Sequence, residues 1–184
     1  RTHGISGSVA MNYIKEYFSK LEAGEVTSKR VYNVYKKLVY NIDNPDTFIF
    51  DEEKANRPIE FVERFCKHSK GEWAGKPITL DLFQKAYINA LFGFVDRKTG
   101  LRKYRESLLY EARKNGKSTM LAGIALYMMI ADGEAGADCY STATKKDQAK
   151  IIFDEVCHMV QQSPELKKYI KKRKSDLYFP LTMS

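Results

Sequence analysis

Apolar side chains spaced three and four positions apart predict helices through the first half of the chain. Residues 9–23 show this spacing, and Gly24 can end a helix there. A second helix is predicted after Thr27, and Asn44-Pro45 ends it. The chain is therefore predicted to begin with a helical region.

The following apolar segments predict a short extended piece and two more helices. Phe48–Phe50 is the extended piece. Pro58 suits the first turn of a helix, so a third helix is predicted to start there. A loop that carries the single tryptophan, Trp73, separates this helix from a fourth one over residues 80–94.

The pattern changes in the second half, where strands and helices alternate. Strands are predicted over residues 104–111 and 137–141, and a helix that is apolar on most of its surface over 117–131. Thr144 resembles the start of a capping box and opens a last helix that runs through Gln161. Such an alternation predicts an α/β fold with parallel strands and right-handed crossovers.

Composition is that of a folded protein without a membrane span. The chain has 184 residues, of which 43% are hydrophobic, and no apolar run reaches the ~18 residues that a span needs. The three cysteines, Cys66, Cys139 and Cys157, are odd in number and widely spaced, which indicates a reducing compartment rather than a disulfide framework. They also lack the paired spacing of a zinc site, so buried side chains are favoured over metal ligands.

The net charge of +8 is concentrated near one end of the sequence. Residues 163–184 carry a net charge of +4, half of the total. Two interpretations stay open: a polyanion partner, or a solvated surface that only aids solubility. The six basic residues of this segment are Lys167, Lys168, Lys171, Lys172, Arg173 and Lys174.

The chemically informative segment is Ala-Arg-Lys-Asn-Gly-Lys-Ser-Thr at residues 112–119, between a predicted strand and a predicted helix. Free N–H groups of such a turn and helix start bind phosphate. Lys117 would reach the outer phosphates, and the Ser118 hydroxyl would ligate Mg²⁺. The full pattern G-x-x-x-x-G-K-[ST] is not met, because Glu111 stands at its first glycine. An ordinary surface loop before a helix is the alternative.

Further blocks flank this loop in a fixed order, namely Phe48–Ala55, Arg57–Phe61, Gly71–Pro77, Leu82–Lys85 and Tyr140–Ala149. Together with residues 112–118 they resemble the large terminase subunit of tailed double-stranded-DNA phages, the ATP-driven motor that packs the genome into a procapsid. The blocks cover well over half of the chain.

The resemblance implies a P-loop NTPase with an incomplete parallel sheet, preceded by a helical N-terminal region. Residues 1–95 would form that helical region and lead into an adenine-binding segment. Residues 96–184 would be the first part of the ATPase domain. The later ATPase motifs and the nuclease domain of the family would lie beyond Ser184.

The resemblance also assigns roles in the site. Arg113 matches an arginine proposed to stabilise charge on the γ-phosphate, although it can serve binding alone. Gln84 matches the glutamine that recognises adenine, although an ordinary helix position explains it as well. Arg113 and Lys117 are the expected catalytic residues, and Ser118 is the expected Mg²⁺ ligand. The expected ATP-binding residues are Gln84, Arg113, Lys114, Asn115, Gly116, Lys117, Ser118 and Thr119.

Two acidic pairs require separate treatment. Asp51-Glu52 follows an apolar run but precedes the phosphate loop, whereas the family's acidic motif follows it, so a turn or helix start is predicted. Asp154-Glu155 falls inside a predicted helix rather than at a strand end. The general base is therefore expected beyond Ser184, and this chain alone is expected to have little ATPase activity.

The function implied is the ATP-binding part of a motor that translocates double-stranded DNA, with ATP and Mg²⁺ as cofactors. Implied partners are DNA, the small terminase subunit, the portal protein and further copies in a ring, with no membrane. The implied location is the host cytoplasm, docked on the procapsid portal. Two alternatives remain: a non-catalytic basic DNA-binding module, and a kinase-like enzyme that shares only the loop.

Overall fold

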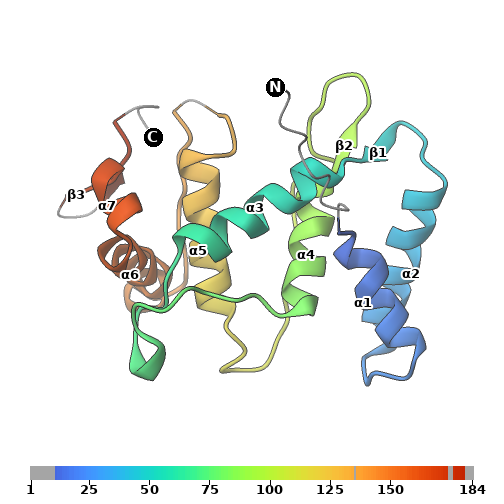
Figure 1. Ribbon diagram of the computed structural model, residues 1–184, viewed down its shortest axis with the longest axis horizontal. Coiled ribbons are helices and arrows are strands. Elements are labelled where there is room, and N and C mark those ends of the chain that lie inside the picture. Colours follow the sequence, from blue (N-terminus) through green and yellow to red (C-terminus); the bar gives the residue numbers. More distant parts are fainter. Residues whose placement is uncertain (1–10, 135, 174–175, 181–184) are drawn as a thin grey trace, which may run out of the picture. The chain divides into compact units, whose positions relative to one another are not determined.

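The computed structural model describes residues 11–134, 136–173 and 176–180 (Figure 1). Contacts group them into two compact units. Unit 1 holds the described residues up to Arg57 together with Asp81–Ser107, and unit 2 holds Pro58–Leu80 together with the described residues from Leu108 onward. The division into functional domains at residue 95 stays a prediction.

Unit 1 is built on three helices, α1 (Tyr13–Glu22), α2 (Lys29–Asp43) and α4 (Leu82–Gly93). Both N-terminal helices start at a polar cap. The Asn12 side chain accepts the Lys15 N–H at 3.1 Å, and the Ser28 hydroxyl accepts the Val31 N–H at 3.2 Å. Of the helix predicted over residues 9–23, the described part starts at Tyr13, and residues 9 and 10 lie outside the described residues.

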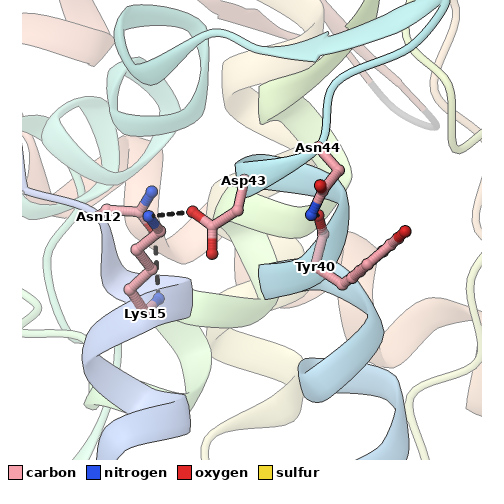
Figure 2. Close-up of polar contacts among 5 residues, drawn as sticks. All are labelled: Asn12, Lys15, Tyr40, Asp43 and Asn44. Atoms are coloured by element: carbon pink, nitrogen blue, oxygen red, sulfur yellow. Dashed lines mark hydrogen bonds and ion pairs between the residues drawn. The ribbon is translucent and has the colours of Figure 1, made fainter.

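Polar contacts join α1 to the end of α2 (Figure 2). The Lys15 ammonium lies 2.6 Å from the Asp43 carboxylate, and both side chains are about half exposed. At the same end of α2, the Asn44 amide donates to the Tyr40 carbonyl at 3.0 Å. Because a surface ion pair contributes at most about 1 kcal/mol, the pair orients the helices and the apolar core holds them.

Asn89 is the main buried polar residue of unit 1, with no exposed surface. Its amide donates to the Ala55 carbonyl and the Asn56 side chain, both at 3.0 Å, and its oxygen accepts the Tyr13 N–H at 3.1 Å. A buried amide is tolerated only when bonded in this way. The surrounding core consists of Ile14, Phe18, Leu21, Tyr35, Leu38, Ala86 and Phe94.

A small antiparallel sheet closes unit 1. Strand β1 (Phe48–Phe50) pairs with β2 (Phe94–Asp96). Gly93 precedes β2, and a Cβ there would lie 2.4 Å from the Phe50 ring. Only glycine therefore allows the ring to pack at this point.

Helix α3 (Glu52–Phe65) starts earlier than the predicted start at Pro58. The Asp51 carboxylate accepts the Lys54 N–H at 3.0 Å and begins the helix, so the prediction of a helix start at Asp51-Glu52 is confirmed. The prediction that Pro58 occupies the first turn is wrong, because Pro58 lies inside the helix and is buried.

Unit 2 contains the 3₁₀ turn η1 (Gly71–Trp73) and three helices, α5 (Lys117–Ile130), α6 (Lys146–Gln162) and α7 (Pro164–Tyr169). A second antiparallel pair, β3 (Lys171–Lys172) and β4 (Leu177–Tyr178), follows α7. Helix α5 packs on α6, and Gly123 of α5 lies so close to Val62 that a Cβ would approach it to 2.9 Å.

The predicted parallel sheet is not found among the described residues, whose sheets are two antiparallel pairs. Residues 104–111 and 137–141 are not strands. A strand needs a hydrogen-bonded neighbour, and these segments have none; Leu108 is 88% exposed and Tyr110 96%.

The predicted start of the last helix, at Thr144, is also wrong. Helix α6 begins at Lys146 after Lys145, and no side chain caps it, so the capping box expected at Thr144 is not formed. Across the described ranges, no helix combines the length and apolar character needed to cross a membrane.

Candidate phosphate-binding site

The loop before α5 has an unusual backbone. Gly116, the N-cap of α5, has a φ of 70°, and Lys114 has a φ of 71°, whereas Asn115 between them does not have a positive φ. Alternation of left- and right-handed residues turns successive N–H groups toward one side and forms an anion-binding concavity. A non-glycine residue in the left-handed region costs roughly 1–3 kcal/mol, and such strain is concentrated at functional sites.

Side chains of the loop bond back onto its own backbone. The Lys117 ammonium donates to the Glu111 carbonyl at 2.7 Å and also to the Ala112 carbonyl. The Glu111 carboxylate accepts the Asn115 amide at 2.7 Å and the Ala112 N–H at 3.0 Å. Glu111 stands where the usual pattern has glycine. Its carboxylate and its carbonyl both accept hydrogen bonds from within the loop, and these bonds hold the loop together.

The first turn of α5 is tied to the rest of unit 2 through a carboxylate. Thr119 donates its hydroxyl to Glu155 of α6 at 3.3 Å. The same oxygen of Glu155 accepts the Ser69 hydroxyl at 2.7 Å. Ser118 lies half-buried beside Thr119, whereas Arg113 and Lys114 are exposed.

Gln84 lies in the other compact unit, in the first turn of α4. It is only 6% exposed, and its amide oxygen accepts the Asp81 N–H at 3.0 Å. The amide oxygen thus serves the helix cap, and the adenine role of Gln84 stays a prediction.

The structure brings together the residues from Glu111 to Thr119 and adds Glu155, whose role the sequence did not reveal. The prediction that Asp154-Glu155 lies inside a helix is confirmed. In the described ranges no group of three or more His, Cys, Asp or Glu side chains is arranged to hold a metal ion.

The cysteines are free in the described chain. Cys66 and Cys157 are buried and Cys139 is exposed. Burial raises the pKa of the Cys66 thiol to about 12, so this thiol stays protonated and unreactive at neutral pH.

Comparison with known proteins places this site in context. Residues 82–180, more than half of the chain, match the family model described as terminase large subunit, ATPase domain. The large terminase subunit of Enterobacteria phage HK97 is 34% identical over 118 residues, which cover 64% of this chain and 22% of that protein. The crystal structure of the HK97 large terminase matches with a TM-score of 0.54 and 34% identity, over 67% of this chain and 24% of the other.

These matches, with the α/β content of the chain, define the class as a P-loop-like fold. The chain belongs to the family of terminase large subunit ATPase domains. It spans about a fifth of the length of its HK97 relative.

Proposed function

We propose that the loop of residues 111–119 binds Mg-ATP and that the chain is the ATP-binding part of a motor that drives double-stranded DNA into a procapsid. The observation that carries this proposal is the backbone of the loop, with left-handed residues at Lys114 and Gly116 directly before α5. Membership in the terminase ATPase family supports it.

The residues present fit a polyphosphate. The helix start offers N–H groups, the alternating loop directs further N–H groups to one side, and Lys117 adds a positive charge. Among the described residues, the acceptors of the Lys117 ammonium are two neutral carbonyls of the loop. A charged phosphate oxygen is a stronger acceptor and can replace them.

Ser118 and Arg113 have proposed roles that their positions near the loop support. Ser118, half-buried in the first turn of α5, supplies a hydroxyl ligand for Mg²⁺, which neutralises phosphate charge when bound. Arg113 is exposed at the loop and is free to turn toward a γ-phosphate. The adenine role of Gln84 is proposed from the resemblance to the family alone, because its amide oxygen already accepts the Asp81 N–H.

The general base that activates water is supplied from outside this segment. Asp51 directly follows β1, but it caps α3 and precedes the phosphate loop in the sequence. Asp154-Glu155 lie within α6 rather than at a strand end. In a protein of the length of the HK97 relative, the segments 104–111 and 137–141 would become strands of a parallel sheet. The small subunit, the portal and further copies would assemble around the motor.

Titration calorimetry of Mg-ATP into the chain and into its Lys117→Ala variant tests the nucleotide site. Binding by the wild type that falls at least tenfold in the variant, with unchanged circular dichroism, is the expected result. Equal binding by both proteins contradicts the assignment of the loop.

A phosphate-release assay on the wild-type chain tests the proposal that the general base is supplied from outside it. We expect no multiple-turnover hydrolysis. Turnover that Lys117→Ala abolishes would place the base within this chain.

A further inference from the structure

Five cations lie on consecutive elements at the end of unit 2: Lys167, Lys168, Lys171, Lys172 and Arg173, named here the basic face. All five are exposed. Helix α7 carries the first two and strand β3 the next two, and these elements adjoin one another beside α6 in Figure 1. The sequence left open whether this charge is a solvated surface or a binding site.

The basic face is held by apolar anchors rather than by mobile loops. Leu166 and Ile170 are each 4% exposed, and Phe179 is 7% exposed. Ser163, fully buried, begins α7 by accepting the Leu166 N–H at 3.4 Å. The lysines therefore stand on elements that buried residues anchor, so ordering them costs less entropy than ordering a flexible tail.

The acidic neighbours, Glu165 and Asp176, offset only part of the charge of the face. The Asp176 carboxylate lies 3.5 Å from the Arg173 guanidinium and forms an ion pair with it. The pKa of Glu165 is lowered first by a backbone N–H bond, and also by the Ser163 hydroxyl and the charges of Lys67 and Arg64. Lys67 and Arg64 thus add positive charge on that side. Among the described residues, Lys167, Lys168 and Lys171 have no ion pair.

The aromatic residues of the face favour phosphate contacts over base stacking. The Lys168 ammonium lies 5.4 Å from the centre of the Tyr169 ring, and the Arg173 guanidinium lies 4.4 Å from that of Tyr178. In each pair the cation covers one face of the ring, which leaves less open ring surface for a base to stack on. Stacking of unpaired bases needs open ring faces.

We propose that the basic face binds the sugar-phosphate backbone of duplex DNA without regard to sequence. The choice of duplex DNA as the polyanion rests on the proposed function. The place of the binding surface is inferred from the exposed lysines that have no ion pair among the described residues. Contacts to phosphate fix position but read no sequence, which suits a motor that must move along any DNA.

The test compares two variants that lose the same charge. Lys167→Gln/Lys168→Gln/Lys171→Gln removes three cations of the basic face. Lys29→Gln/Lys36→Gln/Lys37→Gln removes three exposed cations from α2 in unit 1 and serves as the matched control. Circular dichroism and melting curves confirm that both remain folded.

The readout is the affinity for two unrelated 30-base-pair duplexes and a single strand of equal length, measured across a salt series. In the basic-face variant, we expect the negative slope of log K against log salt to become shallower by about 2 to 3, equally for both duplexes. In the control variant, the slope should change by less than about 1. Wild-type binding by the basic-face variant, an equal loss in the control, or a preference for the single strand overturns the proposal.

Nucleotide binding separates this proposal from the proposed function. Mg-ATP titration of the basic-face variant is expected to match the wild type. If DNA binding does not depend on the basic face while Lys117→Ala still abolishes nucleotide binding, the proposed surface is wrong and the ATP site stands. If Lys117→Ala has no effect, the ATP site is wrong, whatever the DNA result.

Discussion

At the scale of single residues, Glu111 sets the character of the phosphate loop. Its carboxylate organises Asn115 and the Ala112 N–H, yet it places a negative charge next to a site for a polyanion. These two effects oppose each other. A substitution that keeps the acceptor but removes the charge separates them.

We expect Glu111→Gln to bind Mg-ATP about threefold more tightly, because the amide oxygen can still accept and the repulsion is gone. Glu111→Ala loses the acceptor as well, so its affinity should fall below that of Glu111→Gln. Calorimetric dissociation constants of both variants provide the measurement. Weaker binding by Glu111→Gln than by the wild type would show that the charge itself supports the site.

At the scale of elements, Glu155 joins three parts of unit 2: α6, the first turn of α5 and the segment that carries Ser69. Both hydroxyls lose their acceptor in Glu155→Ala, which should lower the free energy of unfolding by about 2 kcal/mol. Glu155→Gln keeps an oxygen acceptor and should cost less than about 1 kcal/mol. Urea denaturation measures both. Glu72→Ala, in the exposed turn η1, is the control and should change little.

Elements with a helical period could be predicted from the sequence, and elements that depend on distant partners could not. Helices α2, α4 and α5 follow their apolar spacing to within two or three residues. The apolar pattern alone placed the start of α3 at Pro58, whereas the local Asp51 cap, predicted as a turn or helix start, marks where the helix begins. Residues 104–111 have the apolar pattern of a strand but lack a neighbour to pair with.

The same distinction applies to the candidate site. Residues 112–119 could be identified because a local loop and helix start make the site. Lys117 bonds to loop carbonyls and Thr119 bonds to Glu155. Because these bonds depend on the folded backbone, they could not be predicted from residue spacing in the sequence. Glu111 was visible only as a departure from the glycine pattern.

At the scale of the whole molecule, highly exposed apolar side chains indicate which segments neighbouring strands would cover. Leu108, Tyr110 and Tyr140 are 88%, 96% and 83% exposed, and all belong to segments with strand-like sequence. Side chains this exposed contribute little to stability. In a protein of the length of the HK97 relative, we expect the same side chains to be covered by neighbouring strands.

Tyr110→Ser measured in both settings tests this expectation. In the present chain, the substitution should change the free energy of unfolding by less than about 0.5 kcal/mol, because Tyr110 is 96% exposed. In a full-length protein that contains this segment, it should cost about 3 kcal/mol, the range of large-to-small substitutions in a core. Urea denaturation gives both values. A small cost in both settings would show that residues 104–111 remain outside the sheet, and a large cost in the present chain would mean that Tyr110 is already packed.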